Sequence, residues 1–158
     1  MSQPRLTYDA FAKIAPVAQQ SLIAMGKQAD DSGIDKQIIE LVKLRVSQLN
    51  NCAFCLQIHL NVSRKLGLPQ EKLDLVATWE EAGIFSEREC AALAWAETLT
   101  RLVGHSVPDQ AYEAVRLHFS EEEVTFLSVS IATINAWNRL GAAFRFAPPI
   151  QKTARAAA

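Results

Sequence analysis

The sequence predicts an all-α protein, a single-domain bundle of about six or seven helices. Residues typical of helix starts and stops recur along the chain, whereas the alternating pattern of strands is nearly absent. The 158 residues are 49% hydrophobic and 21% charged, which is ordinary for a globular protein, and this length suits one domain with a substantial core. We expect the domain at 1–146 and a loose tail at 147–158.

The first half of the chain contains four expected helices, at about 7–27, 35–48, 52–67 and 69–79. Pro16 kinks or restarts the first, because proline lacks the amide hydrogen that a helix interior needs. Asp35 caps the second, Asn51 caps the third, and Gly67 ends it. Pro69 suits the first turn of the fourth, where the amide hydrogen would be unused.

The second half contains three expected helices, at about 86–104, 108–119 and 120–144. Ser86 and Ser120 each stand three residues before a glutamate, which is the capping-box pattern. Pro108 opens the helix between them. The last helix is apolar nearly all round, so it must be covered on several sides. This pattern favours a helix that is both central and at a subunit contact, and hence a homo-oligomer.

Charge and hydropathy exclude several classes of partner. The formal net charge is −1 and the isoelectric point is near 6.3, so no broad basic field is available and nucleic-acid binding is disfavoured. The N-terminus lacks the apolar run of a secretory signal, and no apolar stretch reaches the roughly 18 residues of a membrane span. We therefore expect a cytoplasmic protein. In that reducing compartment a Cys-x-x-Cys pair is redox-active or metal-binding rather than structural.

The segment 51–59 carries the chemistry. At about 100° per residue, Cys52, Cys55 and His59 lie within about 60° of one another on one helix face. Cysteines three apart on a helix have Cα atoms about 5 Å apart, which a disulfide tolerates. The positive end of the helix stabilises a thiolate there. His59, one turn after Cys55, can exchange a proton with it directly or through a water.

A thiolate with a second thiol beside it is the arrangement that peroxide reduction needs. The thiolate becomes a sulfenic acid, and the second thiol condenses with it to a disulfide before over-oxidation. A zinc site and inert packing are the alternatives. Zinc would need a second pair of ligands, but Cys90 stands alone and His105 and His118 are isolated. No metal, haem or other cofactor is therefore predicted.

The segment from Glu40 to His59 resembles the AhpD-like alkylhydroperoxidases of the carboxymuconolactone decarboxylase family. Their pattern is Glu, eleven residues, then Cys-x-x-Cys-x-x-x-His, and this chain matches every position; weaker similarity covers about 16–145. The resemblance implies an AhpD-like fold in which Cys55 attacks the peroxide and Cys52 resolves it, with Glu40 and His59 as a proton relay through water. Family members tend to carry a further His where this chain has Phe54, so we expect a shorter relay or a different preferred peroxide.

Two lines of reasoning disagree about Glu40. It shares a polar helix stripe with Lys36, Lys43 and Ser47, which predicts a solvated acid paired with a lysine. A fold-back at the turn between the two helices instead places Glu40 nearly level with His59. With the spacing of the family added, we favour the relay.

The remaining candidates are interpreted as structural. Arg45 falls on an apolar helix face and needs a buried acidic partner, which predicts an ion pair rather than a substrate contact. Cys90 is expected to pack among small apolar residues. Trp79, Trp95 and Trp137 are expected to anchor the core or an interface rather than line a binding pocket.

The sequence thus predicts an antioxidant thiol peroxidase that reduces organic hydroperoxides through a Cys52–Cys55 disulfide. An external dithiol must regenerate the pair; the resemblance implies a lipoyl protein as one such reductant, and a trimer or hexamer as the assembly. The main alternative is a disulfide oxidoreductase or redox sensor that uses the same pair. A lactone decarboxylase is suggested by the family name alone, and that chemistry needs no cysteine pair.

Overall fold

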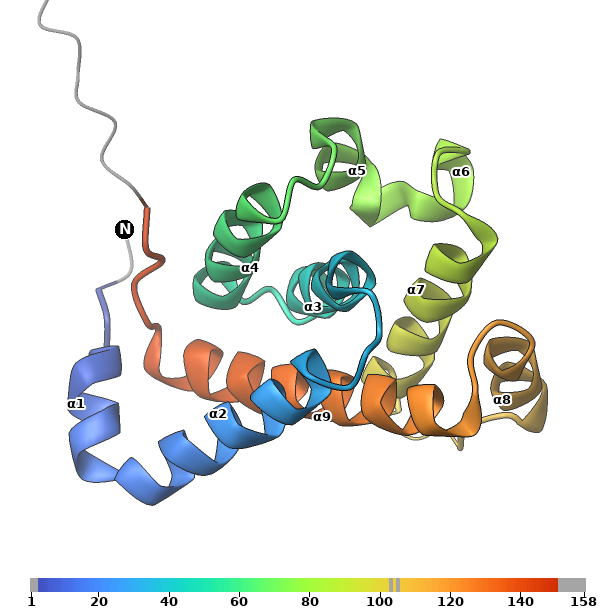
Figure 1. Ribbon diagram of the computed structural model, residues 1–158. Coiled ribbons are helices and arrows are strands. Elements are labelled where there is room, and N and C mark those ends of the chain that lie inside the picture. The colour runs from blue at the N-terminus through green and yellow to red at the C-terminus, as the bar shows by residue number, and fades with distance from the viewer. Residues whose placement is uncertain (1–2, 103, 105, 151–158) are drawn as a thin grey trace, which may run out of the picture.

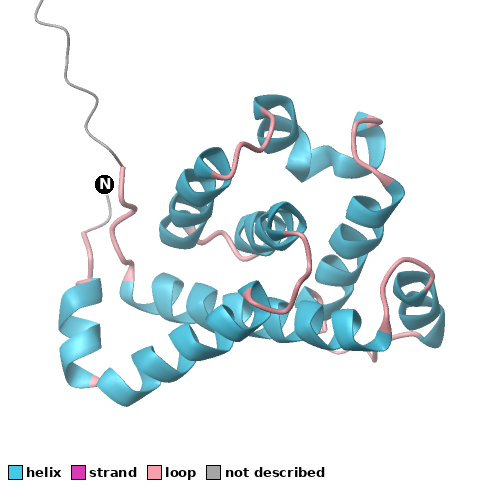
Figure 2. Cartoon of the chain, in the orientation of Figure 1, coloured by secondary structure: helices cyan, strands magenta, loops and turns pink. Residues whose placement is uncertain are grey.

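The computed structural model describes residues 3–102, 104 and 106–150, and in these ranges the only regular secondary structure is helical (Figure 2). This confirms the all-α prediction. The elements are α1 (Tyr8–Ile14), α2 (Pro16–Asp30), α3 (Lys36–Leu49), α4 (Ala53–Lys65), α5 (Gln70–Leu75), the 3-10 turn η1 (Val76–Thr78), α6 (Trp79–Ala82), α7 (Glu87–Thr100), α8 (Asp109–Arg116) and α9 (Glu121–Phe144).

The described ranges hold more helices than the expected six or seven because two expected helices are divided. Pro16 begins α2 rather than kinking a continuous helix, and Ala15 between α1 and α2 has a non-helical backbone. The expected helix at 69–79 consists of α5, the 3-10 turn and the start of α6. The first division is the restart that Pro16 allowed; the second was not predicted.

Most of the expected caps are present. The Asp35 side chain accepts a hydrogen bond from the amide of Gln37 at the start of α3, and Ser86 and Ser120 each form a complete capping box at the starts of α7 and α9. The cap predicted for α4 is wrong. Asn51 has a left-handed backbone with φ 53°, a conformation that asparagine tolerates, and the N-cap of α4 is Cys52.

Helix α3 lies at the centre of the molecule (Figure 1). It packs against α4, α7 and α9, while α2 runs along α9. Most of α3 is buried, including the polar side chains of Glu40, Lys43 and Ser47. Helix α9 is covered by α2 on one side and by α3 and α7 elsewhere, as its apolar sequence requires; the expected homo-oligomer stays a prediction.

The two cysteines of α4 belong to the main hydrophobic core. This core joins α3, α7 and α9 through residues such as Val42, Ala96 and Leu127, and it includes Cys52 and Cys55. A second apolar cluster fills the space between α3, α5 and α7. The sulfurs are therefore set inside the packed protein rather than on a surface loop.

The two ends of the described chain meet beside the end of α9. The backbone amides of Arg5 and Leu6 both donate to the carbonyl of Phe144, at 2.9 and 3.2 Å, and Phe146 is buried. Of the expected tail, residues 151–158 lie outside the described residues, as does His105. No helix in the described ranges is long and apolar enough to cross a membrane.

Candidate active site

The sulfurs of Cys52 and Cys55 meet at the N-terminal end of α4. Both residues are free thiols, their sulfurs lie 2.7 Å apart, and they are only 3% and 2% exposed. Because Cys52 is the N-cap, its Sγ accepts a hydrogen bond from the backbone amide of Cys55 at 3.3 Å. A sulfur thus occupies the place where a serine or aspartate oxygen usually satisfies the first amides of a helix.

The pKa values of the two thiols are shifted in opposite directions. The pKa of Cys52 is lowered to about 7, chiefly because the Cys55 thiol donates a hydrogen bond to its sulfur; burial opposes this, and the Cys55 amide and the Asn138 side chain add to it. The pKa of Cys55 is raised well above the usual thiol range, because its proton is held in that same hydrogen bond and because burial and the adjacent Cys52 sulfur disfavour a second charge. Once the pH exceeds the pKa of Cys52, the pair holds one proton and one negative charge, with the charge on Cys52.

Helix α9 approaches the sulfur pair closely. A Cβ on Gly141 would lie 2.8 Å from Cys52 Sγ and 3.6 Å from Cys55 Sγ, so only glycine allows this packing. One turn earlier on the same face is Asn138, which is 1% exposed. Reasoning from the sequence missed both residues. The available signals were an isolated glycine and an asparagine inside an otherwise apolar helix.

Glu40 and His59 form a part-buried pair, and His59 shares a cavity with Cys55. His59 Nδ1 lies 2.8 Å from Glu40 Oε2, and Lys43 Nζ bridges Glu40 Oε1 at 3.1 Å and Asp30 Oδ1 at 2.6 Å. The predicted juxtaposition of Glu40 and His59 is confirmed. The prediction that Glu40 is a solvated acid is wrong, because Glu40 is only 4% exposed and its polar stripe is covered by the helices around α3. The prediction that it pairs with a lysine is confirmed by Lys43.

The hydrogen bonds keep Glu40 ionised. Burial raises the pKa of Glu40, but the hydrogen bond and charge of His59, together with Lys43, outweigh that effect and hold the pKa below its ordinary value. An ionised carboxylate only accepts hydrogen bonds, so the hydrogen between the two side chains belongs to His59 Nδ1. This leaves Nε2 as the histidine nitrogen free to exchange a proton.

A largely apolar cavity of about 570 Å³ opens beside the pair. Cys55 and His59 both line it, whereas Cys52 does not. Its apolar lining comes from α2, α4 and α9, and includes Leu22, Ile23, Phe54, Ile58, Ile134 and Trp137. The expectation that Trp137 anchors the core without lining a pocket is therefore wrong; its helix is covered on several sides but leaves this face open to the cavity.

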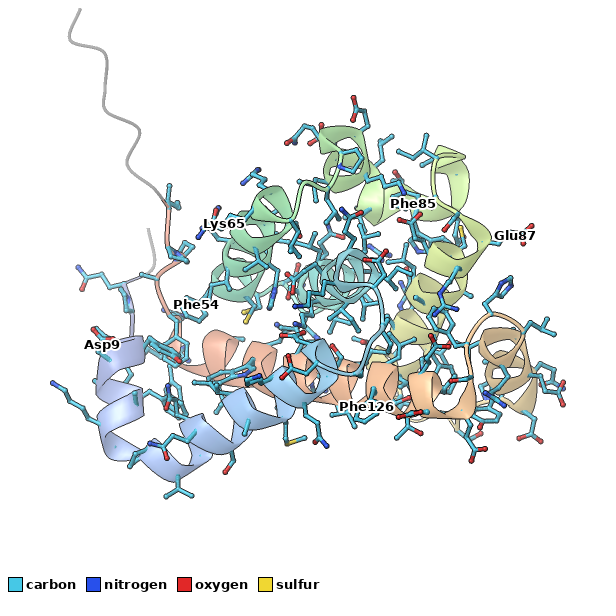
Figure 3. All side chains as sticks on the ribbon, in the orientation of Figure 1. Asp9, Phe54, Lys65, Phe85, Glu87 and Phe126 are labelled. Carbon is cyan, nitrogen blue, oxygen red and sulfur yellow. The ribbon has the colours of Figure 1, made fainter. Side chains whose placement is uncertain are left out.

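Phe54, at the position of the family's further histidine, is part of an aromatic cluster. It lies at the start of α4 (Figure 3), with its ring centroid 5.5 Å from Tyr8 and 5.2 Å from Phe146. Tyr8 and Phe54 both line the cavity. In place of a second titratable ring, this chain presents an apolar wall next to Cys55.

The family of this chain is shown by its match to a known family. A model described as the carboxymuconolactone decarboxylase family matches residues 16–98, just over half of the chain. The chain belongs to this family. Within the carboxymuconolactone decarboxylase family it is AhpD-like: its fold closely matches that of ATU0492 from Agrobacterium tumefaciens, a protein of unknown function described as a candidate antioxidant defence protein AhpD, with a TM-score of 0.87, 36% identity, and coverage of 94% of this chain and 100% of that one.

Two further proteins are similar to this chain, one in sequence and one in fold. The uncharacterized protein YdfG of Bacillus subtilis (strain 168) is 37% identical over 134 residues, which cover 85% of this chain and 91% of YdfG. The debrominase Bmp8 has a TM-score of 0.77 at 18% identity, over 86% of this chain and 73% of that one. At that identity the likeness is one of fold, and the fold therefore supports more than one reaction.

The four residues that match the pattern of the carboxymuconolactone decarboxylase family come together in two contacts. Cys52 contacts Cys55, Glu40 contacts His59, and the cavity brings Cys55 and His59 to one space. Among the described residues, no three His, Cys, Asp or Glu side chains are arranged to hold a metal ion.

The predicted structural role of Arg45 is confirmed. Its Nε donates to Glu97 Oε1 at 2.6 Å, across the α3–α7 contact. Glu97 also accepts from the indole of Trp79 at 3.0 Å and lies 2.8 Å from Arg101. This second cluster contains the buried acidic partner that Arg45 requires.

Proposed function

We propose that this protein is a thiol-dependent peroxidase that reduces organic hydroperoxides through a reversible Cys52–Cys55 disulfide. The observation that carries the proposal is the sulfur pair itself: two thiols in contact at a helix N-terminus, one of which reaches an apolar cavity shared with a carboxylate-bound histidine. Each part supplies one requirement of the reaction, namely the nucleophile, the resolving thiol, the substrate space and the proton carrier.

Access and charge assign different tasks to the two sulfurs. Cys55 lines the cavity and Cys52 does not, which supports Cys55 as the attacking sulfur, as the family resemblance implies. The resting negative charge lies on Cys52. Because the sulfurs are 2.7 Å apart, Cys52 can take the proton of Cys55 as Cys55 attacks, and thus acts as its base before acting as the resolving thiol.

The proposed cycle balances without a cofactor. The Cys55 sulfur passes its proton to Cys52 and bonds to the terminal peroxide oxygen, the O–O bond breaks, and the alkoxide leaves as an alcohol with a proton that His59 Nε2 has taken up from solvent. Cys52, now a thiol, gives its proton to His59 Nε2 and attacks the Cys55 sulfenic acid as a thiolate, and hydroxide leaves with that proton as water. One hydroperoxide and two thiols thus become one alcohol, one water and one disulfide.

Glu40 acts through His59. Its carboxylate holds the Nδ1–H of the imidazole, fixes the tautomer that leaves Nε2 facing the reaction, and stabilises the imidazolium that forms when His59 takes up a proton. Lys43 and Asp30 complete the hydrogen bonding of this buried carboxylate. Lys43 at one carboxylate oxygen and His59 at the other keep Glu40 ionised while His59 takes up and releases the proton.

The cavity also indicates the substrates and the route of regeneration. Its aromatic and aliphatic walls favour a hydroperoxide with an apolar body over hydrogen peroxide, since apolar surface is buried on binding. A reducing thiolate must use the same cavity and therefore attacks Cys55, with Cys52 as the leaving group; a thiol of lower pKa leaves faster. A dithiol on a narrow flexible arm, such as the lipoyl group implied by the resemblance, suits this entrance.

Peroxide consumption tests the proposal. Purified protein should consume cumene hydroperoxide in the presence of dithiothreitol, Cys55→Ser should lose nearly all of this activity, and the matched control Cys90→Ser should keep it, because Cys90 lies on α7 away from the sulfur pair. One equivalent of hydroperoxide without reductant should produce a mass loss of about 2 Da in the tryptic peptide that spans 46–64.

Three outcomes would contradict the peroxidase. Equal rates for wild type and Cys55→Ser, or no consumption above a protein-free control, would remove the enzymatic role. Formation of the disulfide in a single event, with no turnover when dithiothreitol is supplied, would favour the redox sensor instead. Direct exchange with protein disulfides is disfavoured because both sulfurs are buried.

A further inference from the structure

A chain of three asparagine side chains connects the sulfur pair to the surface of α9. Asn50, the C-cap of α3, donates from Nδ2 to Asn135 Oδ1 at 2.9 Å and to Asn138 Oδ1 at 3.0 Å. None of the three lines the peroxide cavity. The chain therefore approaches the sulfurs from the side of Cys52, the sulfur that the cavity does not reach.

The outer end of this chain fixes the orientation of its first amide. Asn135 Nδ2 donates to the Ile131 carbonyl at 3.0 Å, and a backbone carbonyl can only accept. Asn135 Oδ1 accepts from the Arg139 guanidinium at 3.1 Å, and a guanidinium can only donate. With both ends of Asn135 thus assigned, Asn50 must present its amino group to Asn135, and so it donates to Asn138 as well.

At the inner end, the same assignment of donors and acceptors fixes the direction of the Asn138 amino group. Asn138 Oδ1 is occupied by Asn50, so its amino group faces the other way. One of its hydrogens goes to Ser47 Oγ at 3.2 Å; that hydroxyl donates its own hydrogen to the Lys43 carbonyl at 2.8 Å and is therefore the acceptor. The second hydrogen of the Asn138 amino group is not used by Ser47.

Helix α9 approaches the sulfurs about one turn from Asn138. Gly141, three residues after Asn138 and on the same helix face, is the residue whose missing side chain makes room for both sulfur atoms. Hydrogen bonding by the Asn138 side chain lowers the pKa of both thiols. A buried thiolate needs such donors, since an unpaired charge in the core is costly.

We propose that Asn138 is a positioning residue that directs an amide N–H at the sulfur pair, and that Asn50 and Asn135 fix the direction of that amide from Arg139 and the Ile131 carbonyl. The chain holds the pair as one thiol and one thiolate, ready for reaction. Its part in catalysis rests on the proposed peroxidase function, whereas its effect on the thiols does not.

The thiols of the reduced protein provide the test. Thiolate absorbance near 240 nm and the rate of alkylation by iodoacetamide are measured against pH, with no peroxide present, on a Cys90→Ser background so that only the pair reports. Asn138→Ala should raise the midpoint of the first thiol by about one pH unit, a roughly tenfold loss of thiolate below that midpoint. Asn138→Ser, which keeps a hydroxyl donor, should recover part of the shift.

The direction of the chain needs a variant that does not touch the sulfurs. Asn50→Ala removes the donor that orients Asn138 and should raise the midpoint in the same direction by a smaller amount. Asn61→Ala is the matched control, since its amide donates to the Pro149 carbonyl at 3.3 Å; its midpoint should equal that of the background protein. The charged and titratable groups around the pair stay unchanged in every variant: Tyr8 of α1, Lys27 and Asp30 of α2, Glu40 and Lys43 of α3, His59 of α4 and Arg139 of α9.

The outcomes separate this inference from the peroxidase. Midpoints of Asn138→Ala and Asn50→Ala that match Asn61→Ala would overturn the asparagine chain, whatever the peroxide activity. If Asn138→Ala fails to fold, Asn138→Ser and Asn50→Ala carry the same test. Raised midpoints in a protein that consumes no peroxide would leave the chain standing and remove the proposed reaction.

Discussion

Two buried carboxylates lie at contacts of the central helix α3, and they differ in what they can do. Glu40 belongs to α3 and faces His59 of α4, and Glu97 of α7 contacts Arg45 of α3; they are 4% and 8% exposed. In both, burial raises the pKa but hydrogen bonds and positive charges hold it below the ordinary value. Burial and the direction of the pKa shift therefore do not distinguish a catalytic carboxylate from a structural one.

The partners make the distinction. Glu97 is bound by two arginines and an indole, none of which changes its protonation in the physiological range. Glu40 is bound by His59, whose imidazole can both accept and donate a proton and shares a cavity with Cys55. The hollow of about 520 Å³ beside Glu97 has neither cysteine nor histidine among its described lining residues. A perturbed acid becomes a functional candidate when it holds a proton carrier next to a nucleophile.

The largest effect is expected on turnover, from Glu40→Gln. The glutamine carbonyl can still accept from Nδ1, but it no longer stabilises the imidazolium, so kcat/KM for cumene hydroperoxide should fall by about 10²–10³-fold. The fold should be little affected, because Lys43 keeps Asp30 as its partner at 2.6 Å. Steady-state kinetics with dithiothreitol measure this change, and a rate within twofold of wild type would place Glu40 with the structural acids.

Glu97→Gln is expected to lower folding stability rather than turnover. Arg45, with a side chain only 13% exposed, would lose its counter-charge in the core, and removing one partner of a buried ion pair costs about 3 kcal/mol or more of folding stability. Urea unfolding measures the loss, with the exposed acid Glu113→Gln as control. The midpoint of the Cys52–Cys55 pair should not move. A variant of Glu97 that unfolds like wild type but loses peroxide activity would reverse the comparison.

The two clusters also show how much of the molecule the sequence could predict. Local rules were sufficient where the determinants are local: capping boxes placed the starts of α7 and α9, and the spacing of Cys52, Cys55 and His59 placed them on one helix. The need of Arg45 for an acid was readable, because a guanidinium on an apolar face must be neutralised. The identity of that acid was not, since Glu97 is 52 residues away in the chain.

The errors have a common physical origin in long-range packing. Glu40 was ambiguous because a polar stripe on a surrounded helix looks the same in sequence as one on a surface helix. Asn138 and Gly141 were missed because their partners lie across the fold, on α3 and at the start of α4. The cap of α4 moved by one residue, from Asn51 to Cys52. That small register change matters, since it places a helix amide directly on the sulfur.

The smallest effect, and the finest comparison, is the pH dependence of stability. The folded-state pKa of Glu97 is below its unfolded value, so its stabilising contribution is fully present above the unfolded value, near 4.3–4.5, and is lost as pH falls through the folded value. A protonated glutamate is close in shape and charge to a glutamine. The difference in unfolding free energy between wild type and Glu97→Gln should therefore be constant from about pH 7 to pH 5 and shrink below about pH 4.5, whereas Glu113→Gln should differ little from wild type throughout. If the difference in unfolding free energy between wild type and Glu97→Gln stayed constant down to pH 3, shape rather than charge would hold Glu97 in place. Glu40 and Glu97 would then differ in more than their hydrogen-bonding partners.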